Sequence, residues 1–460
     1  MLVMKFGGTS VANAEAMRRV ADIVEGRRDH RPLVVSSATA KTTDELLTLA
    51  HTAARRDREK VDALIDWLME KHLAIVSDLG LSGDSTLVSH IRAVGSELGR
   101  ITSGIWGRAE ADHDRIDDCL SWGEYLSCNI LAAYLRSRGL DGEWVDARKV
   151  FVTDSRFGRA RPLVGESKER ARDIVLPFLA AGKVPVMQGF IGADAKGQTT
   201  TFGRGGSDYS ATLVGAFLSA ERVEIWTDVD GVMTANPSMV KDVRRLRRLT
   251  FDEAAELAYF GAKVLHPSTI LPAMESGISV LVLNSMRPNL PGTEIVPRET
   301  ARNPVARIKS IACKQGLSVI NIKSTRMLMA YGFLASIFDI FNRYETAVDI
   351  VSTSEVSVSV TVDNLERIEQ IMGELQKIAD VEIRHGQAIV SLVGEEICQE
   401  PGLTADVFGE LQGVQINLIS QGASKINISF VIDETELPQV VGRLHARFFS
   451  GDLDEEIFDQ

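Results

Sequence analysis

The sequence has few cysteines and no long apolar run. Its 460 residues hold four cysteines, at positions 119, 128, 313 and 398, and no two of them have the CxxC spacing of a zinc or redox site. So few cysteines exclude a disulfide framework and predict reduced thiols in the cytoplasm. No stretch approaches the roughly 18 consecutive apolar residues of a membrane helix. The first residues lack the features of a signal peptide.

A basic excess is also missing. The chain has 51 basic and 63 acidic residues, which gives a formal net charge of −12. This charge opposes binding to a nucleic-acid polyanion. The densest basic run, 244–248, is short and is best interpreted as a solvated face. We therefore expect neither a nucleic-acid partner nor a membrane partner.

Several common catalytic motifs are absent. There is no GxxxxGK[ST] P-loop, and the segment 203–208, GRGGSD, lacks the final glycine of a GxGxxG dinucleotide site. Neither GxSxG nor HExxH occurs, and the HRD and DFG motifs of protein kinases are missing. These absences argue against a nicotinamide enzyme, a serine hydrolase, a zinc protease and a protein kinase.

Strand and helix patterns alternate over the first 290 residues or so. Residues 41–139 are predicted to be mainly helical, and a helix from about Asn13 presents Met17, Val20, Ala21 and Val24 on one face. The alternation predicts a parallel sheet covered by helices on both faces. Strands are expected at 2–6, 33–36, 143–146, 184–189, 222–227 and 279–283, and later helices near 167–181, 208–220, 251–258 and 267–276.

The last third of the chain contains an internal repeat. Segments 316–322, 332–338 and 354–363 match segments exactly 70 residues later. Each unit is predicted to be a ferredoxin-like βαββαβ fold. Four of the thirteen prolines lie in 287–304, which predicts a linker before the repeat.

The expected domains follow from these patterns. They are an α/β catalytic domain (1–297), a linker (298–308), two repeat domains (309–384 and 385–450) and an acidic tail (451–460). The tail has five acids and no base, and we expect it to be mobile.

Three loops are candidates for anion binding. Gly7 and Gly8 follow the first strand, where backbone N–H groups can hold phosphate and Lys5 adds a positive charge. The second loop is 199–208, which opens a helix. The third is 227–231, at the carboxyl end of a strand, where doubly wound sheets bind ligands. Each loop also has a purely structural interpretation. The first is a plain turn, the second (199–208) a capped helix start, and the third (227–231) a turn with Asx hydrogen bonds.

Four segments resemble the aspartokinases of the amino-acid kinase family: KFGGTSVANAEAM (5–17), QGFIGADAKGQTTTFGRGGSDYSA (188–211), WTDVDGVMTANP (226–237) and FGAKVLHPSTILPA (260–273). The segment TSEVS (353–357) and the doubled 70-residue unit resemble the two ACT domains of that family. The resemblance implies an amino-acid kinase fold followed by two ferredoxin-like ACT domains. A chain ending at residue 460 also suggests an enzyme without a fused homoserine dehydrogenase.

The reaction implied by the resemblance is ATP plus L-aspartate giving ADP plus 4-phospho-L-aspartate, the first step towards lysine, threonine and methionine. Mg²⁺ is expected to arrive with ATP, without a dedicated protein metal site. The attacking carboxylate, with a pKa near 3.9, is already ionised at neutral pH and needs no general base. Catalysis is then positioning and charge neutralisation.

The resemblance also implies a set of site residues. The catalytic residues would be Lys5 and Asp208. Aspartate would be held by Ser37, Thr43, Glu124, Arg204 and Ser207. The nucleotide would contact Lys5, Gly7, Gly8, Thr227, Asp228, Lys263 and Val264. An amino-acid effector would contact Met327, Gly332, Phe333, Leu334, Val348, Asp349, Thr353, Ser354 and Glu355.

Some positions depart from the family pattern. Lys41 and Asp44 in the substrate loop, and Met233 and Ser238 near the nucleotide, are unusual, and Ala330 and Ala347 stand where lysine-inhibited members have serines. Lysine is nevertheless the first candidate effector and threonine the second. We expect a homodimer formed through the ACT domains, or a tetramer. The alternative function is a catalytically impaired, amino-acid-sensing regulatory protein.

Overall fold

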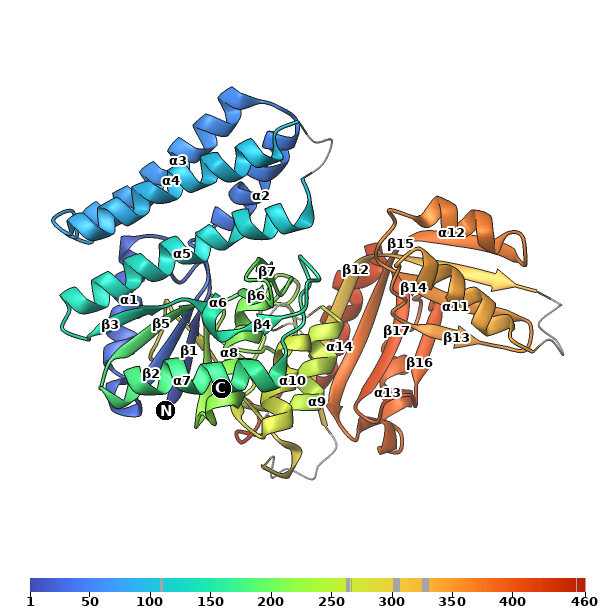
Figure 1. Cartoon of the computed structure of the whole chain (residues 1–460). Coiled ribbons are helices and arrows are strands. Elements are labelled where there is room, and N and C mark those ends of the chain that lie inside the picture. Colours follow the sequence, from blue (N-terminus) through green and yellow to red (C-terminus); the bar gives the residue numbers. More distant parts are fainter. Residues whose placement is uncertain are drawn as a thin grey trace. The chain divides into compact units, whose positions relative to one another are not determined.

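The computed structural model describes residues 1–107, 111–261, 265, 267–300, 307–324, 331–451 and 453–459. The chain forms two compact units. The first comprises Met1–Val232, Arg247–Phe251 and Val264–Ala301, and the second comprises Met233–Leu246, Asp252–Lys263 and Arg302–Gln460. The fold is α/β in the first unit and α+β in the second (Figure 1).

The first unit is built on an eight-stranded sheet of order β3-β5-β2-β1-β8-β10-β11-β9. The first six of these strands run parallel, and β11 is antiparallel to β10. The predicted parallel sheet is therefore confirmed. The strands are β1 (Leu2–Phe6), β2 (Pro32–Ser36), β3 (Gly142–Val145), β5 (Val184–Gln188), β8 (Arg222–Thr227), β9 (Arg248–Thr250), β10 (Ser279–Asn284) and β11 (Thr293–Val296).

Helices of the first unit follow the predicted pattern. Asn13 caps the first helix by accepting a hydrogen bond from the backbone N–H of Ala16, as expected for an N-cap asparagine. The four apolar residues of its predicted face are all fully buried. The helices are α1 (Ala14–Glu25), α2 (Thr42–Ala54), α3 (Arg58–Asp78), α4 (Ser85–Ile105), α5 (His113–Ser137), α6 (Ala147–Val150), α7 (Val164–Ala180), α8 (Gly206–Leu218) and α10 (Pro267–Ser276).

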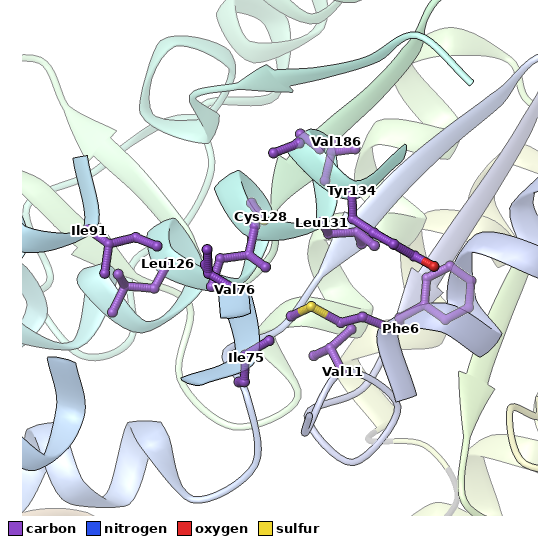
Figure 2. Close-up of a cluster of buried hydrophobic side chains, with 14 of the residues drawn as sticks. Phe6, Val11, Ile75, Val76, Ile91, Leu126, Cys128, Leu131, Tyr134 and Val186 are labelled. Carbon is purple, nitrogen blue, oxygen red and sulfur yellow. The ribbon is translucent and has the colours of Figure 1, made fainter. Parts of the chain in front are cut away.

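One apolar cluster joins the sheet to helices α1 to α5 (Figure 2). It contains Phe6 of β1, Val186 of β5 and Leu131 of α5, together with Ile75 and Val76 of α3. Burying each such side chain stabilises the fold by roughly 1.5–3 kcal/mol. The cluster thus fixes α3 and α5 relative to the carboxyl ends of the central strands.

Several short elements of the first unit were not predicted. A small sheet of order β4-β6-β7 is formed by Val152–Thr153, Ile191–Asp194 and Thr199–Thr201. The proline-rich stretch 287–304 also contains β11, whose Ile295 and Val296 are buried in the main sheet. The interpretation of the whole stretch 287–304 as a linker is therefore wrong for Thr293–Val296, which lie within the expected catalytic domain (1–297). Prolines on either side of a four-residue strand hide its pattern.

The second unit contains a six-stranded antiparallel sheet of order β13-β14-β12-β15-β17-β16. The two repeats in this unit are offset by 70 residues, as predicted. Gly332 and Gly402, which precede equivalent helices, have φ of 82° and 89°, a backbone conformation that favours glycine. The elements are α9 (Phe251–Tyr259), β12 (Arg307–Lys323), α11 (Phe333–Arg343), β13 (Val351–Thr353), β14 (Ser357–Val362), α12 (Ile368–Leu375), β15 (Asp380–Glu395), α13 (Leu403–Gly409), β16 (Leu418–Gln421), β17 (Asn427–Asp433) and α14 (Leu437–Phe449).

The two repeats share their long strands. Residues 318–323 of β12 pair with β14 and with the first half of β15, whereas residues 307–314 pair only with the second half of β15. The first half of β12 therefore takes the place of the last strand expected after α14. No such strand follows α14 among residues 450–451 and 453–459. The boundary proposed at residue 384 falls inside β15, where one continuous strand serves both repeats.

The acidic tail is packed against the second unit. Ile457 and Phe458 are buried, and the Phe458 ring lies 5.9 Å from that of Phe449. Asp459 forms an ion pair with Arg245. The expected mobile tail is therefore wrong for residues 453–459, because its two apolar residues outweigh the acidic composition. Across the described residues, no helix combines the length and apolarity needed to cross a membrane.

Candidate active site

The predicted glycine loops meet at the carboxyl ends of the central strands. Phe6 of β1 pairs with Ser36 of β2 and with Trp226 of β8. The Gly7 N–H donates to the Trp226 carbonyl at 3.1 Å, and the Ser37 N–H donates to the Phe6 carbonyl at 3.0 Å. Parallel strands bind ligands at this edge of a sheet.

A pocket of about 330 Å³ lies at this edge. It brings together seven of the predicted catalytic, substrate and nucleotide residues. It also exposes the two unusual substrate-loop residues, Lys41 and Asp44, to whatever binds there. The lining consists of Lys5, Gly8, Ser37, Ala38, Thr39, Ala40, Lys41, Thr43, Asp44, Glu124, Phe190, Gly203, Gly205, Gly206, Ser207 and Asp208.

Lys5 and Asp208 form an ion pair in this pocket. The Lys5 Nζ lies 2.5 Å from an Asp208 carboxylate oxygen, and Lys5 is only 8% exposed. Asp208 belongs to the first turn of α8, which starts after Gly205 with φ of 70°. The N-terminus of a helix favours negative charge. A buried ammonium held by a helix-end carboxylate suits the stabilisation of a phosphoryl group.

Glu124 of α5 is an almost fully buried acid that lines the pocket. One carboxylate oxygen accepts a hydrogen bond from the Ala38 N–H at 3.2 Å, and the other is buried without a hydrogen-bond partner. Burial raises the pKa of Glu124 to about 8, against the opposing effect of the Ala38 bond. An unpaired buried carboxylate is costly, so this site favours a cationic ligand group.

The loop between β2 and α2 forms one wall of the pocket. The Ser127 hydroxyl of α5 donates to the Ser37 carbonyl at 2.6 Å, next to the Ala38–Glu124 bond. Gly8 approaches this loop so closely that an added Cβ would lie 3.0 Å from the Ala38 carbonyl oxygen. A side chain at position 8 would require one of the two loops to shift by a few tenths of an ångström, so glycine suits this close contact.

Other predicted site residues lie around the pocket or outside the described part. Thr227 is the last residue of β8 and Asp228 follows it, beside the loop of Gly7. Arg204 is exposed between the lining residues Gly203 and Gly205. Lys263 and Val264 lie outside the described residues, as does Met327.

Four lining residues were not singled out from the sequence: Ala38, Thr39, Ala40 and Phe190. Thr39 and Ala40 lie in the loop after a predicted strand, and the same position after a strand identified the glycine loops. Phe190 has φ of 70°, rare for a residue with a side chain, and its N–H bonds to the Ser210 hydroxyl at 2.9 Å. Sequence periodicity carries no information about such a backbone conformation.

The predicted effector residues, apart from Met327, lie in the first repeat of the second unit. Gly332 precedes α11, and Phe333 and Leu334 begin that helix. Asp349 and Val348 precede the edge strand β13, which contains Thr353, and Ser354 and Glu355 follow it. Thr353, Ser354 and Glu355 are exposed.

Comparisons with known proteins agree with this geometry. The model of the amino acid kinase family matches residues 1–284, and an ACT domain model matches residues 390–448. The lysine-sensitive aspartokinase 3 of Escherichia coli is 39% identical over 463 residues, covering 98% of this chain and 99% of that protein. Aspartokinase 1 (chloroplastic) of Arabidopsis thaliana is 39% identical over 470 residues, covering 98% of this chain and 81% of that protein.

Solved structures agree as well. The E. coli aspartokinase III complex with aspartate and ADP, in its R-state, superposes with a TM-score of 0.86 at 36% identity, covering 98% of this chain and all of that one. The T-state complex of the same enzyme with lysine and aspartate has a TM-score of 0.81 at 37% identity. The chain therefore belongs to the amino acid kinase family, and within it to the aspartokinases that carry C-terminal ACT domains.

Proposed function

We propose that this chain transfers the γ-phosphoryl group of ATP to the side-chain carboxylate of L-aspartate. The observation that supports this most is one pocket that holds a buried Lys5–Asp208 ion pair and a buried, half-satisfied Glu124. The first can stabilise a phosphoryl group, and the second can bind the α-ammonium of an amino acid. The alternative of a catalytically impaired regulatory protein is not favoured, because Lys5 and Asp208 are both in place.

The chain's own residues position the substrates and neutralise negative charge on the transferred phosphoryl group. Lys5 faces the oxygens of the transferred phosphoryl group, and Asp208 holds the Lys5 ammonium in place. Backbone N–H groups at the start of α8 face the same negative charge. Bound ATP supplies the phosphoryl group, and its Mg²⁺ neutralises phosphate charge. The carboxylate of aspartate attacks without a general base.

A coupled assay of ADP release tests the substrate class. Aspartate, glutamate and N-acetylglutamate are supplied as separate acceptors with ATP and Mg²⁺. We expect release with aspartate and little with the other two. Release with glutamate or N-acetylglutamate in its place would assign the chain to another branch of the family.

Arg204 is proposed to bind a carboxylate of aspartate with its guanidinium. Arg204→Lys keeps the charge but loses the two-pronged geometry. We expect about a tenfold higher KM for aspartate, equivalent to about 1.4 kcal/mol, with little change in kcat. Arg159→Lys, a neighbouring change outside the pocket lining, serves as the control. An unchanged KM in Arg204→Lys would remove this residue from the substrate site.

We propose further that the second unit senses an amino acid, with lysine as first candidate and threonine as second. The E. coli aspartokinase III complex with lysine supports this choice. Asp349 was predicted to receive the effector's ammonium. It is already 2.7 Å from the Lys314 ammonium, which also lies 2.8 Å from Asp363. An entering lysine therefore competes with an internal lysine for the same carboxylate.

Two substitutions separate these roles. Asp349→Ala should retain catalysis and lose inhibition by the effector. Lys314→Met should lower the effector concentration for half-inhibition by about tenfold, because about 1.4 kcal/mol of competing interaction is removed. Lys377→Met, which breaks an exposed lysine–Glu374 pair on α12, is the matched control. Activity that is indifferent to lysine, threonine and their mixture would reject the switch.

The proposed assembly is a homodimer through the ACT repeats, or a tetramer of two such dimers. The strand β13 is a sheet edge, and Leu334, Phe338, Val351 and Val356 are exposed apolar residues near it. Pairing of two copies would cover this edge. The proposed location is the cytoplasm, consistent with four free cysteines. The proposed role is the first step towards lysine, threonine and methionine.

A further inference from the structure

The substrate loop of residues 37–41 has a backbone that must be held in place. Ser37, Thr39, Ala40 and Lys41 all line the pocket. Lys41 has φ of 66°, in the left-handed region that costs free energy for a residue other than glycine. A loop with such a residue keeps one conformation only when surrounding contacts impose it.

Two neighbouring residues of α3 supply such contacts. The His72 Nε2 lies 3.1 Å from the Thr39 hydroxyl, and the His72 Nδ1 lies 2.6 Å from the Leu68 carbonyl oxygen. The Lys71 ammonium donates to the Ala40 carbonyl at 2.6 Å and to the Thr42 hydroxyl at 2.9 Å. The hydroxyls of Thr39 and Thr42 are 2.7 Å apart.

The donor and the acceptor of each hydrogen bond between Lys71, Thr42, Thr39 and His72 can be deduced. A carbonyl oxygen only accepts, so the His72 Nδ1 carries the proton. The Nε2 of the neutral ring must then accept from the Thr39 hydroxyl. Because the single hydroxyl proton of Thr39 is used, Thr39 accepts from Thr42. Thr42 in turn accepts from the Lys71 ammonium.

The protonation state of His72 agrees with the deduced direction of its hydrogen bonds. The imidazole is fully buried, and burial lowers its pKa to about 4, so the ring is neutral at physiological pH. Burying a polar ring costs free energy unless its nitrogen atoms are hydrogen-bonded. Its neighbours along α3, Leu68 and Ile75, belong to the apolar core. The imidazole is thus explained by its bond to the pocket loop.

We propose that His72 and Lys71 are positioning residues that hold the substrate loop in the conformation that accepts the amino-acid substrate. They do not touch the substrate; they act through Thr39, Thr42 and Ala40. The inference rests on the proposed function, because the substrate is taken to be aspartate. It assigns to α3, which contributes no lining residue, control over substrate affinity.

The test compares two substitutions at position 72. His72→Phe fills the space but cannot accept a hydrogen bond from Thr39, whereas His72→Gln offers an amide oxygen near the position of Nε2. We expect His72→Phe to raise KM for aspartate by about tenfold, because a buried hydroxyl loses its acceptor. KM for ATP and kcat should change less than twofold, and His72→Gln should recover most of the affinity.

Thr42→Val provides an independent arm. Thr42 is fully buried and does not line the pocket. Its substitution removes the hydroxyl that links Lys71 to Thr39 by hydrogen bonds. It should raise KM for aspartate as His72→Phe does, and the double variant should be no worse than either single one. The control is Thr102→Val in α4, which removes a buried hydroxyl bonded to the Leu98 carbonyl at 2.8 Å.

Two results would overturn the inference. One is an unchanged KM for aspartate in both His72→Phe and Thr42→Val. The other is an equal rise in KM for aspartate and for ATP, which would indicate general loosening of the unit. Should His72→Phe fail to fold, His72→Gln and Thr42→Val decide the question. A wild-type chain inactive with aspartate contradicts the proposed function instead, and the comparison is then made with the acceptor that it uses.

Discussion

Replacing Lys5 by alanine is expected to reduce kcat by about 10²- to 10³-fold, the typical effect of removing one preorganised donor to a developing negative charge. The Lys5 ammonium is buried and lies at the edge of the sheet where the pocket opens. Water that fills the space left by the side chain carries no positive charge. The charge it stabilises is largest in the transition state, so KM for aspartate should change little.

Asp208→Ala should reduce kcat in the same direction, because it removes the carboxylate that holds the Lys5 ammonium. The double variant should be little worse than Lys5→Ala, since the two side chains act as one unit. Lys183→Ala, which breaks a half-exposed pair with Glu143 at 3.3 Å, is the matched control and should keep wild-type turnover. Near wild-type kcat in Lys5→Ala at saturating substrate would show that its role is wrongly assigned.

Glu124→Gln is expected to raise KM for aspartate by about 100-fold, close to the 3 kcal/mol lost when one partner of a buried charge pair is removed. Glutamine has nearly the shape of glutamate, so the Ala38 N–H keeps an acceptor and the loop keeps its contact. Only the negative charge that would receive the α-ammonium disappears. Steady-state kinetics with aspartate as the varied substrate measure this change.

The pH dependence gives a second signature of Glu124. Burial raises the pKa of this carboxyl to about 8 in the free chain, so it is mostly protonated at pH 6 to 7. Binding an ammonium requires the ionised form, and one proton must then be released. Affinity for aspartate should therefore rise with pH up to about 8, by up to tenfold per pH unit. In Glu124→Gln this dependence should vanish.

An exposed acid, Glu166, provides the control for the measurements of KM and of its pH dependence. Glu166→Gln removes an exposed carboxylate paired with Arg170 on α7. It should leave both KM and its pH dependence at wild-type values. If Glu124→Gln also bound aspartate normally, the ammonium would have to lie elsewhere in the pocket.

Local patterns allowed most of the first unit to be predicted. The strand ending at Phe6, the cap at Asn13 and the buried face of α1 are properties of short segments, so periodicity and residue type reveal them. The glycine loops were identified for the same reason, and the pocket brings the first two of them together.

Long-range pairing explains what was missed. Residues 307–314 join the second repeat across more than 70 residues, which a repeat pattern in the sequence does not reveal. The bond between Thr39 and His72 likewise joins a loop to a helix 33 residues later. The packed tail likewise depends on Arg245 and Leu246, more than 200 residues earlier, which composition alone ignores. In each case the decisive neighbour is distant in the sequence.

The central claim is that this chain forms a mixed anhydride between phosphate and the side-chain carboxylate of aspartate. The most direct measurement is trapping of that product with hydroxylamine, in a reaction of the full chain with ATP, Mg²⁺ and L-aspartate. We expect aspartyl hydroxamate in amounts equal to the ADP released, and about 10²- to 10³-fold less with Lys5→Ala over the same period. ADP release without hydroxamate, or hydroxamate formed equally well from glutamate, would contradict the assignment.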